Sequence, residues 1–219
     1  MADPRFIAHA PRIIVAAVLL LHILGFLAES HIAEGLSPAV WACVGAIDAV
    51  IAYRCGVLVQ TAFKDNLTAL YNRHYFAAAI AGRVGRGSTG NEAALLMIDI
   101  DDFKQINDKH GHAMGDAVLR QLADLLRASI RKNDAAIRWG GEEFLVFLTG
   151  ADKNSARLFA ERLRATVERH PFGQDPHTVA VTVSIGIAAA TATADLEQLI
   201  RLADDALYRA KQTKNKVIA

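Results

Sequence analysis

The sequence predicts an α/β domain over residues 61–219, preceded by an apolar helical hairpin over residues 1–60. Two observations predict this division. Between residues 13 and 59 the charged side chains are few: Glu29, Glu34, Asp48 and Arg54. From Lys64 onward, charged residues of both signs are mixed with short apolar runs that alternate with helical patterns, which is typical of an α/β domain.

The N-terminal part contains two apolar runs, at residues 13–28 and 36–59. The first is slightly short of the ~17 to 25 residues of a spanning helix, although an arginine at its end can snorkel. Basic residues flank the outer ends of the runs, at Arg5, Arg12, Arg54 and Lys64, whereas the connector has none. By the positive-inside rule, residues 13–59 are predicted to form a hairpin in the inner membrane with the following domain in the cytoplasm.

Two other interpretations of this segment stay open. A cleaved signal peptide would also have a basic start and an apolar run, but a second apolar run follows. A helical hairpin that buries its apolar faces in a soluble dimer would accommodate Asp48, which costs about 2.5–3.5 kcal/mol at the centre of a bilayer. In a membrane, we expect Asp48 to lie at a helix contact, paired across a dimer or with Arg54.

The run "ALLMIDI" at residues 94–100 is too short for a helix and is predicted to be a buried strand. Asp99 and Asp101 lie two residues apart and therefore share a side, and Asp102 follows at once. The apolar spacing of residues 118–130 then predicts an amphipathic helix, with Asp116 in its first turn.

The stretch "IRWGGEEFLVFL" at residues 137–148 predicts a hairpin, with Gly140 and Gly141 supplying positive φ at the turn. A solvated hairpin tip is the simplest interpretation of Glu142 and Glu143. If the second strand pairs with the strand that ends at Asp99, however, Asp99 and Glu142 converge at one edge of the sheet. Converging carboxylates repel one another unless they share a cation, and Mg²⁺ with substrate phosphates is the usual solution in nucleotide enzymes.

Nearby polar residues suit a guanine nucleotide. Lys104 offers a point charge to phosphate, and Asn107 both donates and accepts hydrogen bonds. Ionised Asp116 only accepts, which matches the two adjacent N–H donors of guanine and would repel the bare ring nitrogen of adenine. A net charge of +1 without a clustered basic face predicts no nucleic-acid partner.

Several motifs in order and spacing resemble the GGDEF-domain diguanylate cyclases over residues 65–217. They are "DNLTALYNRHYF" (65–76), "DIDDFKQINDKHGHAMGD" (99–116), "RKND" (131–134), "RWGGEEF" (138–144), "VTVSIGIA" (181–188) and "ADDALYRAK" (203–211). The resemblance implies a palm-like α/β fold, related to adenylyl cyclases and polymerases, with an antiparallel-rich sheet flanked by helices. It also implies a homodimer that condenses two GTP into cyclic di-GMP and two pyrophosphates.

The resemblance assigns roles by position. Two Mg²⁺ or Mn²⁺ ions per site would be bound by Asp99, the backbone carbonyl of Ile100 and Glu142, and Glu142 would accept the proton of the attacking 3′-hydroxyl. Guanine, ribose and phosphates would be bound by Asn107, Asp116, His112, Lys104 and Lys211. Cyclic di-GMP would inhibit by binding Arg131 and Asp134, for which a charged helix end followed by a turn is the simpler interpretation.

Asp101 and Asp102 could be further metal ligands, but support of the ligands or a helix cap is favoured. Two departures from the family pattern are visible. Ala69 stands where the family has glycine, and the tail "AKQTKNKV" is one residue short, so that Lys214 could replace the usual basic group. Alternative functions are a degenerate domain that binds nucleotide without turnover, a cyclase with an adenine-containing product, and a scaffold.

Overall fold

The computed structural model describes residues 38–80, 92–174, 176–190 and 196–219. The chain divides into two units, residues 1–63 and 64–219. In the first unit, helix α2 (Pro38–Ala62) covers the second predicted apolar run, whereas the first run lies outside the described residues. No helix in the described part of the chain is long and apolar enough to cross a membrane. The membrane hairpin therefore stays a prediction.

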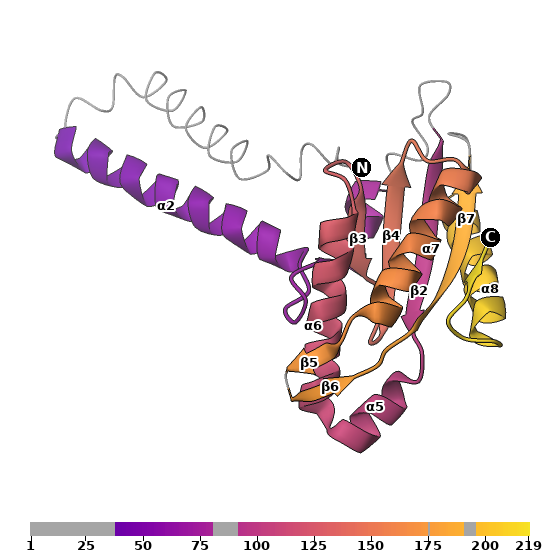
Figure 1. Ribbon diagram of the computed structural model, residues 1–219. Helices are drawn as coiled ribbons and strands as arrows, with labels where there is room; N and C mark the ends of the chain where they lie inside the picture. Colours follow the sequence, from indigo (N-terminus) through magenta and orange to yellow (C-terminus); the bar gives the residue numbers. More distant parts are fainter. Residues whose placement is uncertain (1–37, 81–91, 175, 191–195) are drawn as a thin grey trace. The chain divides into compact units, whose positions relative to one another are not determined.

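The second unit is built on a six-stranded mixed sheet with the order β1-β3-β4-β2-β7-β8 (Figure 1). Its central pairs β3–β4, β4–β2 and β2–β7 are antiparallel, and the edge strands β1 and β8 pair in parallel. This confirms the predicted palm-like, antiparallel-rich α/β fold. The strands are β1 (Tyr71–Asn72), β2 (Ala93–Ile100), β3 (Ala135–Arg138), β4 (Glu143–Thr149), β7 (Val183–Ala190) and β8 (Val217–Ile218).

Helices cover both faces of this sheet. Alternate residues of β2, such as Leu96 and Ile98, form one core with apolar residues of α6 (His112–Ser129) and α7 (Lys153–Arg169). Helix α8 (Leu196–Lys211) packs on β7 and β2 from the opposite face. At Gly186 of β7 an added Cβ would lie 2.2 Å from the backbone of α8, so only glycine permits this contact.

The smaller elements connect these layers. Helix α5 (Phe103–His110) packs on α6 through a turn at Gly111, whose φ is +82°. Strands β5 (Phe172–Gln174) and β6 (His177–Val179) form a separate antiparallel ribbon. The short α3 (Arg73–Tyr75) and the π-helix η2 (Phe76–Ile80) follow β1.

Two local predictions are wrong. Helix α6 begins at His112, so Asp116 lies in its second turn rather than in its first, because the turn at Gly111 starts the helix earlier than its apolar pattern does. The β3–β4 hairpin forms, but neither Gly140 nor Gly141 has a positive φ. Its turn is longer than a two-residue turn, and the Glu143 carboxylate folds back over Gly140, where an added Cβ would lie 2.6 Å from it.

Candidate active site

The predicted carboxylates converge at the end of β2. Strand β4 pairs with β2 in a register that sets Glu143 directly across from Asp99. The backbone N–H of Ile100 donates to the carbonyl of Glu142 (3.4 Å), which places the Glu142 backbone beside the end of the strand. The structure therefore brings Asp99, Ile100 and Glu142 together, and adds Glu143, which the sequence interpretation gave no role.

The carboxylates repel one another in a partly buried site. Burial raises the pKa of Asp99, and Asp101 adds to the rise while the Lys211 ammonium opposes it. Burial, followed by the charge of Asp99, likewise raises the pKa of both Glu142 and Glu143. A cation placed between these carboxylates reduces their mutual repulsion and is therefore bound favourably.

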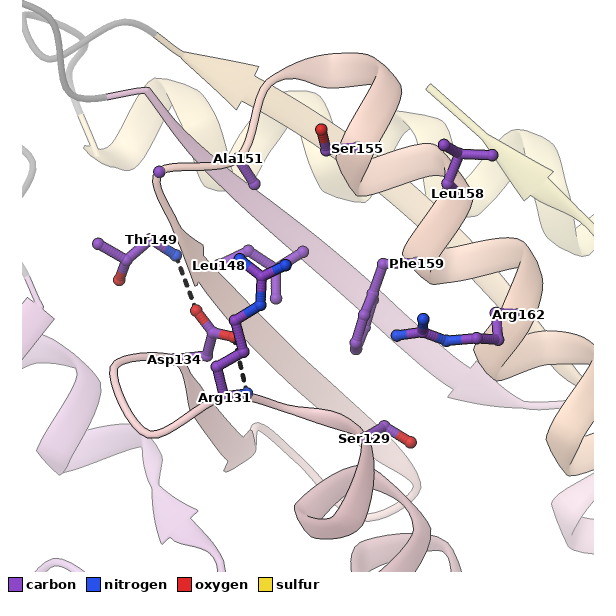
Figure 2. Close-up of a pocket in the computed structure, with 11 residues that line it drawn as sticks. Ser129, Arg131, Asp134, Leu148, Thr149, Ala151, Ser155, Leu158, Phe159 and Arg162 are labelled. Atoms are coloured by element: carbon purple, nitrogen blue, oxygen red, sulfur yellow. Dashed lines mark hydrogen bonds between the residues drawn. The ribbon is translucent and has the colours of Figure 1, made fainter.

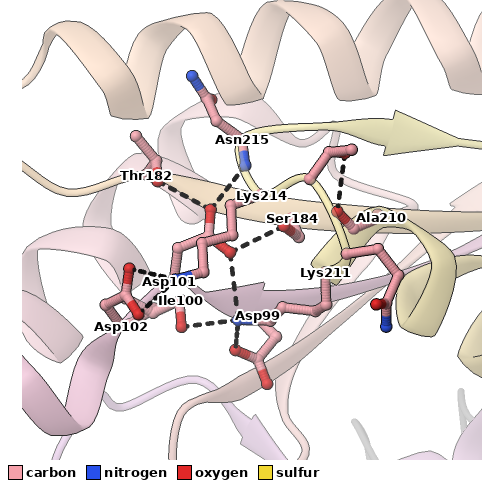
Figure 3. A network of polar contacts seen from close by, with 12 residues as sticks. Asp99, Ile100, Asp101, Asp102, Thr182, Ser184, Ala210, Lys211, Lys214 and Asn215 are labelled. Carbon is pink, nitrogen blue, oxygen red and sulfur yellow. Dashed lines mark hydrogen bonds and ion pairs between the residues drawn. The ribbon is translucent and has the colours of Figure 1, made fainter.

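In the structure this cation is the ammonium of Lys211, at the end of α8 (Figure 3). Its Nζ forms an ion pair with Asp99, donates to the carbonyl of Ile100 (2.9 Å) and lies 3.2 Å from Asp101. Lys211, which the family resemblance assigns to nucleotide binding, thus contacts two of the three predicted metal ligands, Asp99 and the carbonyl of Ile100.

Asp101 is a buried support rather than an open ligand. Its carboxylate accepts hydrogen bonds from the hydroxyls of Thr182 and Ser184 and from the backbone N–H of Asn215, each at 2.8 Å. Burial alone would raise the pKa of Asp101, but these donors and Lys211 outweigh it and lower the pKa. The favoured interpretation of Asp101, support of the ligands, agrees with this geometry.

Asn215 connects this support to α7, a link that the sequence interpretation missed. The Asn215 side chain accepts from Arg164 (2.7 Å) and donates to Glu168 (2.7 Å), while its own backbone holds Asp101. Its φ is +46°, a conformation that asparagine tolerates better than most residues. Asn215 therefore anchors the loop after α8 to helix α7 through its side chain and to Asp101 through its backbone.

Lys214 and Asp102 pair with each other. The Lys214 ammonium lies 2.7 and 2.8 Å from the two carboxylate oxygens of Asp102. Asp102 stands at the N-cap of α5, yet its side chain makes no capping hydrogen bond, so the helix-cap interpretation of this side chain is wrong. Lys214 has a φ of +56°, a value that glycine would adopt without strain.

The predicted guanine residues lie on the α5–α6 pair. A Cβ added at Gly115 would meet the side-chain oxygen of Asn107 at 2.0 Å, so Asn107 packs directly on the residue before Asp116. Asp116 is half-buried and lies 3.7 Å from Arg120, one turn further along α6. Lys104 lies exposed in the first turn of α5, and His112 is the first residue of α6.

The turn that carries Glu142 is held in place by Asp65, near the beginning of the second unit, through Arg138. Arg138 contacts both carboxylate oxygens of Asp65 (3.1 and 3.2 Å) and donates to the carbonyl of Gly141 (2.7 Å). Trp139 packs against the edge of Phe76 and beneath the guanidinium of Arg73. These contacts join residues far apart in sequence, and the motif positions alone did not indicate them.

Arg131 and Asp134 line a pocket of about 290 Å³ between the start of β3 and α7 (Figure 2). Asp134 is held by the backbone N–H groups of Arg131 (2.9 Å) and Thr149 (3.0 Å). Arg162 of α7 also lines the pocket, beside the ring of Phe159. Arg162 was not predicted from the sequence, because no local motif links it to Arg131.

The oxygen ligands at the end of β2 fit a hard divalent ion. Among the residues described, no cluster of three or more His, Cys, Asp or Glu side chains could by itself hold a metal ion. The predicted set is smaller, with the carboxylates of Asp99 and Glu142 and one carbonyl. Mg²⁺ is commonly bound by one or two carboxylates together with substrate phosphates, so the set is sufficient when nucleotide is present.

The sheet is palm-like and carries carboxylates at the end of β2 and in the neighbouring turn. Comparison with known proteins gives the family. The profile described as "Diguanylate cyclase, GGDEF domain" matches residues 62–216. The chain therefore belongs to the GGDEF family of diguanylate cyclase domains.

Individual relatives agree with this family. Diguanylate cyclase DgcS of Shewanella oneidensis is 39% identical over 151 residues, which cover 68% of this chain and 50% of DgcS. Response regulator PleD of Caulobacter vibrioides is 38% identical over 165 residues, which cover 73% of this chain and 36% of PleD. The chain thus matches half or less of the length of these relatives.

A solved structure is similar over more of the chain. The coiled coil and GGDEF domain of DgcB from Caulobacter crescentus, in complex with c-di-GMP, superposes with a TM-score of 0.77 at 27% identity. The match covers 83% of this chain and 97% of that one.

Proposed function

We propose that this chain is a diguanylate cyclase that condenses two GTP into cyclic di-GMP and two pyrophosphates. The observation that carries the proposal is the meeting of Asp99, Ile100 and Glu142 at one edge of the sheet. The packing of Asn107 on Gly115, the residue before Asp116, supports guanine as the base. The c-di-GMP bound to DgcB supports the product.

The chemistry is an in-line displacement at phosphorus. The 3′-oxygen of one GTP forms a bond to the α-phosphorus of the other, the bond to pyrophosphate breaks, and the hydroxyl proton passes to Glu142. Glu142, half-buried in the turn beside the end of β2, would accept this proton. Asp99, the Ile100 carbonyl and Glu142 would hold Mg²⁺ or Mn²⁺, which supplies charge neutralisation at the phosphates.

The reaction requires two copies of the domain. Each domain has one predicted guanine site, so the two nucleotides must be presented by two sites that face each other. A homodimer is therefore part of the proposed mechanism.

Incubation of the purified chain with GTP and Mg²⁺ tests the function. We expect cyclic di-GMP and pyrophosphate in a ratio of one to two, identified by mass spectrometry and a phosphate assay. Binding of GTP without product would favour the degenerate nucleotide-binding domain instead. A product that contains adenine, formed from mixed GTP and ATP, would favour the altered cyclase.

Product inhibition at the Arg131 pocket is a second proposal. Two arginines and the exposed Leu158 line this pocket, which suits a flat base carrying phosphate. Arg131→Ala is expected to relieve inhibition by added cyclic di-GMP while leaving the initial rate with GTP unchanged. Arg157→Ala, an exposed arginine of α7 outside the pocket, is the control. Equal inhibition of the Arg131 variant and the parent would contradict the proposal.

The N-terminal segment is proposed to anchor the domain in the inner membrane. Its scarcity of charge supports this, as do exposed apolar side chains on α2, which are 53–59% exposed at Ile47, Val50 and Ile51. The chain is expected to stay with membranes through a high-salt wash and to leave them in detergent. Release by salt alone would favour the soluble helical dimer.

A further inference from the structure

The β5–β6 ribbon lies against α6, the helix that carries Asp116 (Figure 1). The ribbon is fixed to the domain at its base. Phe172 of β5 is fully buried in the core, and its partner Val179 of β6 packs against the same core. The ribbon can therefore act as a rigid support for whatever it contacts.

Its main polar contact with α6 is made by Gln121. The side-chain amide donates to the carbonyl of Gly173 (2.7 Å) and accepts from the N–H of the same residue (2.8 Å). This double hydrogen bond uses both ends of the amide, and a hydrocarbon side chain of equal size could make neither bond.

The same glycine also contacts the start of α6. A Cβ added at Gly173 would lie 3.1 Å from the sulfur of Met114, and 2.4 Å from the carbonyl of His177. With a φ of +108°, this position accepts glycine alone. The ribbon thus holds α6 at Met114 and at Gln121, on both sides of Asp116.

The start of α6 is less buried than its later turns. Gly115 and the apolar residues from Val118 onward are buried, whereas Met114 and Asp116, on either side of Gly115, are only half-buried. Asn107 packs on Gly115 without space to spare, so a small tilt of the first turns changes how Asn107 and Asp116 face a base together.

We infer that Gln121 is a positioning residue for guanine selection, which holds the first turns of α6 on the β5–β6 ribbon so that Asp116 meets the base-pairing edge of guanine. This inference rests on the proposed function. It concerns residues that do not themselves touch the nucleotide.

The experiment compares GTP with inosine triphosphate, which lacks the 2-amino group of guanine. Gln121→Leu removes both hydrogen bonds at similar size, and Gln121→Glu keeps only the acceptor. For Gln121→Leu we expect KM for GTP to rise about fivefold to tenfold, kcat to change less than about twofold, and the preference for GTP over inosine triphosphate to fall. Gln121→Glu should show a smaller effect in the same direction.

Gln198→Leu is the matched control, because Gln198 is exposed on α8, and its kinetics should equal those of the parent. A Gln121→Leu variant with the parent's KM and nucleotide preference overturns the inference. So does a loss of kcat that is equal for both nucleotides, or a failure of both Gln121 variants to fold, since each indicates a purely structural role. A parent chain that makes no dinucleotide from either substrate refutes the proposed function instead.

Discussion

At the scale of single residues, a substitution at Glu142 is expected to change turnover without lowering the stability of the fold. Glu142 lies half-buried in a turn, and burial and the charge of Asp99 raise the pKa of its carboxyl. The ionised form of Glu142 therefore lowers the stability of the folded state. Glu142→Gln keeps the size and removes the charge. We expect turnover to fall about a hundredfold or more, with the thermal midpoint equal to or above that of the parent.

Glu92→Gln is the control for this substitution. Glu92 is exposed just before the opposite end of β2, so its loss of charge should leave turnover unchanged. Turnover of the Glu142 variant at the parent's rate would remove Glu142 from the mechanism.

Ala69 is expected to affect stability rather than turnover, because it replaces the glycine of the family pattern and its backbone conformation is strained. Its φ is +56°, in the left-handed region that costs an alanine about 1–2 kcal/mol. Glycine adopts this conformation freely, so Ala69→Gly is expected to raise the free energy of unfolding by about 1 kcal/mol in urea titrations. Ala165→Gly, within α7, should lower it by about 1 kcal/mol. Destabilisation by both substitutions would contradict the strain at Ala69.

At the scale of elements, the β3–β4 turn depends on Asp65, 73 residues away from Arg138. Burial raises the pKa of Asp65, but the hydrogen bonds from Thr68 and the charge of Arg138 outweigh it, so the net pKa is lowered. A lowered pKa in the folded state means that the contribution to stability is complete above the unfolded pKa of about 3.9 and is lost as the pH falls through the folded value.

Asp65→Asn is therefore expected to lower the free energy of unfolding by about 2 kcal/mol at pH 7, and the difference from the parent should shrink below about pH 4. Urea titrations at several pH values measure this. Asp124→Asn breaks the exposed pair with Arg127 and should cost less than about 1 kcal/mol. A difference for Asp65→Asn that is independent of pH would show that its charge does not carry the effect.

At the scale of the whole molecule, the sequence predicted what lies within contiguous motifs. The strand over residues 94–100 and the β3–β4 hairpin are confirmed, because apolar length and a glycine-rich turn are local signals. The pairing of β2 with β4, which the sequence analysis could state only as a condition, is present in the structure. The contacts of Arg138 with Asp65, of Asn215 with Arg164 and of Gln121 with Gly173 were not predicted. Each joins polar residues more than fifty positions apart, and a single sequence carries no signal for such pairs.

The requirement for two facing domains gives the last prediction. If each cyclic di-GMP needs a GTP activated in both subunits, a dimer with one Glu142→Gln subunit is inactive. When equal amounts of parent and variant exchange subunits at random, only about one quarter of the dimers are pairs of parent subunits. The activity per parent chain should then fall to about half of its value without the variant. Adding the same amount of Glu92→Gln chain should not lower it, and an unchanged value with the Glu142 variant would mean that each subunit acts alone.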